Sequence, residues 1–302
     1  MYDQISANKR KTVLLIFVFV LLLSAVGLAI DYLLRGGVIG LIIVAIIVGA
    51  SSFFSYFNSD KVALKMAHAV PADPVKYARY HNLVEGLCIA SGLPKPRLYI
   101  VDDPAPNAFS TGRSPKHAAV AVTTGLLDTM NRVELEGVLA HELSHIRNYD
   151  VLVMTLAVTM VGIIALLSDY FLRIMFWTGG RAGRDNENSN NPLGIVFAVL
   201  GFVLLIFAPI IAALMQMAVS RNREYLADAS GVQLTRYPPG LISALEKLKG
   251  DHTVTHFASK ATAHLWIEEP LDKKSNKGET KWNHLFDTHP PLDDRIHALE
   301  QM

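Results

Sequence analysis

Cysteine and charged residues are scarce in this 302-residue chain. The single cysteine, Cys88, excludes an internal disulfide and suits a reducing compartment, where its expected role is that of a small buried apolar residue. Charged residues make up 18% of the sequence and hydrophobic residues 51%, which is unusual for a soluble globule. The net charge of +1 provides no concentrated basic face, so nucleic acid is not expected as a partner.

Four long apolar runs contain no charged side chain; they lie at residues 13–30, 38–57, 151–167 and 193–219. Because about 20 helical residues cross the hydrocarbon layer, the fourth run spans it easily, whereas the third needs Asp169 to lie near an interface. Buried core helices of a soluble protein are the alternative, but such helices usually carry a polar stripe. The runs therefore predict four membrane crossings.

Two soluble stretches remain between the runs, and together they are large enough for one ordinary domain. The second pair of crossings would interrupt that domain. In chain order we expect a first membrane hairpin at 1–57 with crossings at 13–34 and 37–57, a soluble part at 58–150, a second hairpin at 151–219 with crossings at 151–172 and 193–219, and a soluble part at 220–302.

Lysine and arginine are distributed unevenly around the first two runs. Three precede the first run, four follow the second between residues 58 and 79, and only Arg35 lies between them. By the positive-inside rule, the N-terminus, the C-terminus and both soluble parts are expected to be cytoplasmic. The first run resembles a signal peptide, but it is longer than a typical apolar signal core and a second run follows almost at once, so a retained anchor is expected.

The clearest chemical motif is His-Glu-Leu-Ser-His at residues 141–145. Residues four apart share one face of a helix, so His141 and His145 can direct their imidazoles at one metal ion while Glu142 leans toward the same site. A helix is indicated here because Asn131 and Glu134 form an N-cap pair before an apolar helical face. The motif therefore predicts two Zn²⁺ ligands and a general base.

Other short-range patterns predict a small sheet beside this helix. Residues 73–91 have helical apolar spacing that stops at Gly92, and two prolines then favour an extended path. Residues 97–101 and 118–123 are short, rich in β-branched or aromatic residues, and bounded by Pro, Asp or Gly, so both are predicted to be strands.

A catalytic zinc site normally has three protein ligands and one open position for water. The third ligand is expected to be Glu224, because its segment follows the fourth run directly, just as His145 directly precedes the third. Asp228 lies one helical turn beyond Glu224, where it can accept a ring N–H from a ligating histidine and so fix the tautomer.

Together these motifs resemble the M48 family of zinc metallopeptidases, and most closely the HtpX-like membrane proteases, over nearly the whole chain. Further matches are Asn107-Ala-Phe-Ser-Thr-Gly112, the strand at 118–123 leading into Gly125-Leu126-Leu127, and His289-Pro290-Pro291 with Arg295. The resemblance implies that one Zn²⁺ per chain is bound by His141, His145 and Glu224, with Glu142 as the base. It also implies a mainly α integral membrane protein, in which four transmembrane helices carry a cytoplasmic α+β zincin-like (gluzincin) metallopeptidase domain with a small sheet.

Several residues of the family motifs have weaker support from their own surroundings. His289 and Arg295 would hydrogen-bond the developing oxyanion in support of catalysis, or bind substrate, or hold the last helix in place. Asn107 would grip the substrate backbone, or would be a turn residue. An extended substrate is expected to add itself as a strand beside Ala118 and Val120, which would require little sequence specificity.

The expected function is a zinc endopeptidase in the bacterial cytoplasmic membrane. At about 1.5 Å per helical residue, His145 and Glu224 lie within about 10 Å of the neighbouring apolar runs, so the site should be close to the lipid bilayer. The expected substrates are cytoplasmic parts of membrane proteins or unfolded polypeptides, in protein quality control. The alternatives are a CAAX-type prenyl-protein endopeptidase, whose branch usually has more crossings, and a non-catalytic membrane scaffold with a structural metal.

Overall fold

The computed structural model describes residues 2–34, 37–157, 159–160, 221–251, 253, 265–267 and 290–302. Within the third predicted crossing, residues 151–157 and 159–160 are helical, in a helix that begins at Asp150. The rest of that crossing, the fourth crossing and His289 lie outside the described residues.

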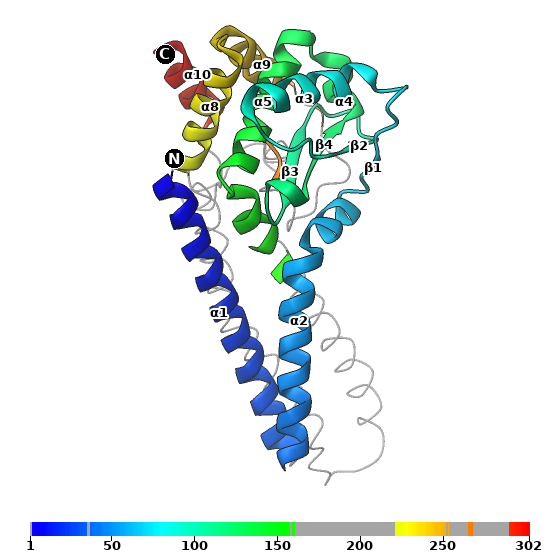
Figure 1. Cartoon of the computed structure of the whole chain (residues 1–302), viewed down its shortest axis with the longest axis vertical. Coiled ribbons are helices and arrows are strands. Elements are labelled where there is room, and N and C mark those ends of the chain that lie inside the picture. Colours follow the sequence, from blue (N-terminus) through cyan, green and yellow to red (C-terminus); the bar gives the residue numbers. More distant parts are fainter. Residues whose placement is uncertain are drawn as a thin grey trace, which may run out of the picture.

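Two long apolar helices extend from one side of the remaining described structure (Figure 1). They are α1 (Tyr2–Leu34) and α2 (Gly37–Met66). Both are long and apolar enough to cross a membrane, and only 22% of the apolar window of α1 and 6% of that of α2 are buried. A core helix of a soluble protein would be mostly buried, so these exposed apolar faces fit a lipid environment.

Helices α1 and α2 share an apolar cluster with the helix that begins at Asp150. Phe19 and Leu22 of α1 and Val48 of α2 are buried in this cluster together with Val153 and Leu156. The N-terminal helix is therefore docked by its side chains to the segment that follows the His-Glu-x-x-His motif.

Helix α2 continues past Phe57, where the first membrane hairpin was expected to end, and reaches Met66. Its last turns carry Ala63 and Leu64 into a buried cluster with Val101 and Ala121 of the sheet. The second apolar run and the sheet are thus joined by one unbroken helix.

The sheet has four strands in the order β1-β2-β4-β3. The strands are β1 (Val70–Pro71), β2 (Arg97–Val101), β3 (Ala108–Gly112) and β4 (Ala118–Thr123). Strands β2 and β4 are parallel and match the predicted strands, whereas β1–β2 and β3–β4 are antiparallel. Strand β3 was not predicted, because Ala-Phe-Ser-Thr-Gly has only one β-branched and one aromatic residue and no apolar alternation.

The place of β4 contradicts the expected substrate pairing beside Ala118 and Val120. Strand β4 is hydrogen-bonded to β2 along one edge and to β3 along the other, so neither edge is open to an added strand. Both residues are buried. Spacing along the chain could not reveal this, because strand order depends on pairing between distant segments.

Besides α1, α2 and the helix that begins at Asp150, seven helical elements have bounds within the described residues. They are α3 (Ala78–Ser91), the 3₁₀ turn η1 (Pro115–His117), α4 (Thr124–Thr129), α5 (Arg132–Arg147), α8 (Arg221–Thr235), α9 (Pro238–Gly250) and α10 (Leu292–Glu300). Helix α3 begins later than predicted, because the Asp73 carboxylate accepts the backbone N–H groups of Val75 and Lys76 in a turn. It ends as predicted at Gly92, whose φ of 69° lies in the left-handed region.

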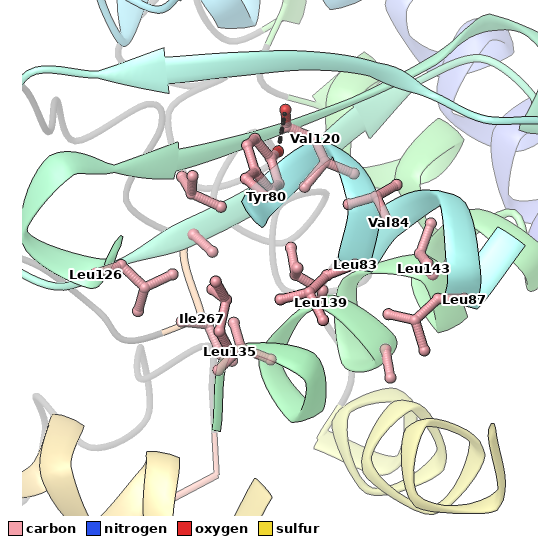
Figure 2. Packing of buried hydrophobic residues seen from close by; sticks show 14 of the residues in the cluster. Tyr80, Leu83, Val84, Leu87, Val120, Leu126, Leu135, Leu139, Leu143 and Ile267 are labelled. Carbon is pink, nitrogen blue, oxygen red and sulfur yellow. Dashed lines mark hydrogen bonds between the residues drawn. The ribbon is translucent and has the colours of Figure 1, made fainter. Parts of the chain in front are cut away.

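Helix α5, which carries the His-Glu-x-x-His motif, is fixed at its start and along its apolar face. The predicted capping box is present, since Asn131 accepts the N–H of Glu134 and the Glu134 carboxylate accepts the N–H of Asn131. Figure 2 shows Leu135, Leu139 and Leu143 among apolar side chains of neighbouring elements. The motif therefore sits on a rigid element at the centre of the core.

Candidate metal centre

Helices α5 and α8 bring together the three predicted ligands. His141 Nε2 and His145 Nε2 are 3.1 Å apart. One carboxylate oxygen of Glu224 lies 3.6 Å from the first of these atoms, and the other lies 3.5 Å from the second. All three side chains are buried, and they form a group that could hold a metal ion.

These separations match the requirements of tetrahedral zinc. Donor atoms about 2.0–2.1 Å from a tetrahedral ion lie about 3.3 Å from one another. The separation of the two imidazole nitrogens, 3.1 Å, and the separation of each from one of the two Glu224 oxygens, 3.6 and 3.5 Å, lie close to that value. Two imidazoles and one carboxylate are a common donor set of catalytic zinc. The residues present therefore fit zinc.

The packing of α8 on α5 depends on Gly231. A Cβ atom at this position would lie 3.0 Å from the backbone nitrogen of His141, so a larger residue would crowd the α5 backbone and glycine permits the close approach. Glu224, Asp228 and Gly231 lie at helical spacing on the face of α8 that is turned to α5. The small residue thus sets the distance between the glutamate and the two histidines.

Asp228 lies behind His141, as the sequence predicted. Its Oδ1 is 2.8 Å from His141 Nδ1, and its two oxygens accept bonds of 2.8 and 2.7 Å from Arg295. Burial would raise the pKa of Asp228, but Arg295 and His141 outweigh it and lower the pKa to about 2. An ionised Asp228 holds the ring proton on Nδ1 of His141 and directs Nε2 to the metal position.

Asp150 orients His145 as Asp228 orients His141, and this role was not predicted. Its Oδ2 lies 3.2 Å from His145 Nδ1, so each histidine has its own buried carboxylate. The residue stands five positions after His145 and immediately before the third apolar run, at the end of the soluble part expected at 58–150. The spacing His-x-x-x-x-Asp across a helix end was the signal available in the sequence.

The pKa of His145 is raised to about 9 in the metal-free chain. Burial acts in the opposite direction, but the carboxylate of Glu224, the hydrogen bond to Asp150 and the charges of Asp150 and Glu142 together outweigh it. The imidazole is therefore protonated at neutral pH until a metal ion displaces the proton.

Zinc binding must release the proton of His145, and the free-energy cost of that release falls as the pH approaches the His145 pKa of about 9. Zinc affinity should therefore rise about tenfold per pH unit from neutral pH up to about 9. Competition with a chromophoric chelator at several pH values measures this slope. Calorimetry in buffers of different ionisation enthalpy counts the protons released. A zinc affinity that does not change with pH over this range would contradict a protonated His145 in the metal-free chain.

Arg295 is placed differently from the substrate contact that the family motif suggested. Its side chain is fully buried, and it donates to Asp228 and, at 3.3 Å, to the carbonyl of Ile267. Its Nη1 is 3.6 Å from the Glu224 carboxylate. Burial lowers the pKa of Arg295, but the charges of Asp228, Glu224 and Glu142 outweigh it and raise the pKa. The bonds of Arg295 to Asp228 join α10 to α8 behind the ligands, which fits the predicted alternative of holding the last helix in place.

The outer edge of β3 passes close to this centre. Trp266 forms a bridge with Phe109 of β3, their rings meet edge-on with centroids 4.7 Å apart, and the Ile267 N–H donates to the Ala108 carbonyl at 2.9 Å. The backbone carbonyl of the same residue, Ile267, accepts a hydrogen bond from Arg295. The short segment 265–267 therefore joins the sheet edge to the support of the metal ligands.

Two further predicted residues are both buried, in different settings. Glu142 is buried on α5 beside His141. Asn107 is buried immediately before β3, where its side-chain oxygen accepts the Ala108 N–H at 3.0 Å.

Comparison with known proteins gives a consistent result. Residues 74–302 match the family model of Peptidase family M48. The whole chain is 45% identical to a Protease HtpX homolog of Caldanaerobacter subterraneus subsp. tengcongensis, of which it covers 98%, and 45% identical to one of Streptococcus uberis, of which it covers 100%. The crystal structure of S. mikatae Ste24p is similar over 99% of this chain and 67% of that chain, with 17% identity and a TM-score of 0.46.

Proposed function

This chain belongs to peptidase family M48 and is a membrane metalloprotease, and from this premise we propose that it is a zinc-dependent endopeptidase acting on cytoplasmic parts of membrane proteins. The observation that carries the proposal is the group of three buried donor side chains from α5 and α8, whose donor atoms are close enough to share one metal ion. One Zn²⁺ per chain would be held by His141, His145 and Glu224.

When bound, zinc polarises a scissile carbonyl and lowers the pKa of its water to about 7. Glu142 accepts the proton of the attacking water and then donates it to the leaving amine. Asp228 and Asp150 keep both histidines in the tautomer that presents Nε2. Arg295 balances the charge of the buried carboxylates.

The extended substrate pairs with the outer edge of β3 in this proposal. Strands β1 and β3 lie at the two ends of the strand order. We choose β3 because its outer side contacts segment 265–267, which is bonded to Arg295 behind the metal ligands. Main-chain pairing of this kind requires little sequence specificity and suits unfolded polypeptides. The substrate would take the position that Trp266 occupies beside Phe109.

Trp266→Ala should then lower KM for an extended peptide by about two- to tenfold, because the segment that competes for the edge loses an aromatic contact of about 0.5–1.5 kcal/mol. Leu265→Ala is the matched control, since it removes buried apolar surface from the same segment but leaves the aromatic pair in place. Steady-state kinetics of both variants below their unfolding temperatures measures the effect. An unchanged KM in Trp266→Ala would contradict substrate pairing at this edge.

For the membrane arrangement we propose four crossings, with both termini and the metal centre on the cytoplasmic side of a bacterial plasma membrane. The exposed apolar faces of α1 and α2 and the basic residues at their cytoplasmic ends support this orientation. Reporter fusions placed after each apolar run test the number of crossings and their direction.

The substrate class is tested by reconstituting the protein in vesicles with a membrane protein that carries an unstructured cytoplasmic loop. We expect cleavage within that loop, loss of cleavage on zinc chelation, and little cleavage when a stably folded domain replaces the loop. Such selectivity would suit the removal of misfolded membrane proteins. Equal cleavage of the folded and unfolded loops would contradict the quality-control role.

A further inference from the structure

The N-terminal helix α1 reaches the metal centre through Asn8. This side chain is only 2% exposed, and its amide nitrogen donates to the carbonyl of Asn148 at 2.9 Å and to Asp150 Oδ1 at 2.7 Å. In Figure 1 the N-terminal end of α1 lies at the side of the structure where α8 begins. Arg223 of α8 also approaches Asp150, with its Nη1 3.9 Å from Oδ1.

Asp150 divides its two oxygens between α1 and the ligand. Oδ1 accepts from Asn8, and Oδ2 faces His145 Nδ1 at 3.2 Å. A neutral amide donor holds the carboxylate in one orientation without cancelling its charge, so the carboxylate remains a strong acceptor for the imidazole. The contact therefore fixes the direction of the acceptor that orients His145.

The turn that carries Asp150 needs outside support. Asn148 caps α5, Tyr149 has a φ of 61°, and the next helix begins at Asp150. A bulky non-glycine residue in this left-handed region is strained, and such a conformation persists only where its surroundings enforce it. Asn8 binds the residues on both sides of Tyr149, and the Lys9 ammonium lies 5.2 Å from the centre of the Tyr149 ring.

We propose that Asn8 is a positioning residue of the metal centre: it holds Asp150 in the orientation that directs His145 at the metal, so the N-terminal membrane helix forms part of the active site. This inference rests on the proposed zinc site but not on the proposed substrates. Because α1 is docked to the helix that begins at Asp150 through Phe19, Leu22, Val153 and Leu156, Asn8 is presented by a rigid element. The first crossing thus does more than retain the protein in the membrane.

The test uses full-length protein in detergent and measures zinc affinity by chelator competition, together with the visible spectrum of the Co²⁺-substituted protein. Loss of a carboxylate that orients a ligating histidine typically costs about 10- to 100-fold in metal affinity, so this is the expectation for Asp150→Ala. Asn8→Ala should cost about three- to tenfold, because Asp150 is retained but less well oriented. Its Co²⁺ spectrum should shift.

Two further variants separate positioning from a general effect on helix packing. Thr12→Val is the matched control, because Thr12 is buried one turn further along α1 and bonds only the Asn8 carbonyl among the contacts described; its zinc affinity should equal that of wild type. In an Asp150→Ala background, Asn8→Ala should have no further effect, since the residue through which it acts is gone.

An equal loss of affinity from Asn8→Ala in both backgrounds, or no loss in either, would overturn the inference. The substrate proposal is tested independently of the role of Asn8. If zinc affinities follow the expected pattern but the protein does not cleave loops of membrane proteins, the role of Asn8 is supported and the substrate class is rejected.

Discussion

Glu142→Gln should lower proteolysis by about 10²- to 10⁴-fold while zinc stays bound, because glutamine has nearly the same shape as glutamate but cannot accept the proton of the attacking water. Glu142 is buried on α5 beside His141, but it is not one of the three grouped donors. Hydrolysis of an unfolded model protein and the metal content of the same purified sample are the two measurements. Both are needed, because activity alone cannot distinguish a lost base from a lost metal.

Glu136→Gln is the matched control, since it makes the same substitution six residues earlier on α5, outside the grouped donors, and should leave activity and zinc content unchanged. Undiminished proteolysis in Glu142→Gln would refute the assignment of the base. Loss of zinc together with activity would instead place Glu142 among the groups that hold the metal.

Arg295→Ala should lower the free energy of unfolding of the metal-free protein by about 3–5 kcal/mol, because it leaves buried carboxylates without their cation. Arg295 is fully buried, donates two bonds to Asp228, and lies 3.6 Å from a Glu224 oxygen. Thermal or denaturant unfolding in detergent with a chelator measures the loss. The result distinguishes buried support from a role in binding substrate, which would lower activity but leave stability nearly unchanged.

Two controls make the comparison specific. Lys249→Ala removes a cation from an exposed pair with Asp293, whose side chains are 52% and 68% exposed, so a change within about 1 kcal/mol is expected. Arg295→Met combined with Asp228→Leu replaces the whole buried pair by apolar groups and should recover much of the stability. Zinc affinity in that double variant should stay about 10- to 100-fold below wild type, because His141 has lost its oriented acceptor.

Much of the candidate site could be predicted because its signals are local or lie at membrane boundaries. The spacing of His141 and His145 matches one turn of a helix, and the capping pair at Asn131 and Glu134 predicted where that helix begins. Glu224 was identified from its place after an apolar run, opposite His145. The structure places these residues together.

What was missed or mistaken depends on contacts between distant segments. The pairing of β3 with β4 and the interior position of β4 depend on strand order, which cannot be predicted from the residues of one segment. For Arg295 the sequence left a contact with substrate and a role in holding the last helix both open, because the family motif gives a position along the chain but not the direction of the side chain. Asp150 was overlooked because its partner is a ring nitrogen five residues earlier, across the end of a helix.

The sequence by itself determined the helix with its ligands, the strands β2 and β4 and the apolar runs, because helical and strand periodicity act over a few residues. Only the tertiary structure decided which groups stand behind those ligands. Asn8 and Asp150 are 142 positions apart and meet because apolar packing docks α1 against the helix that begins at Asp150. The contact between Asn8 and Asp150 depends on how whole helices pack, and no local sequence pattern at either residue predicts it.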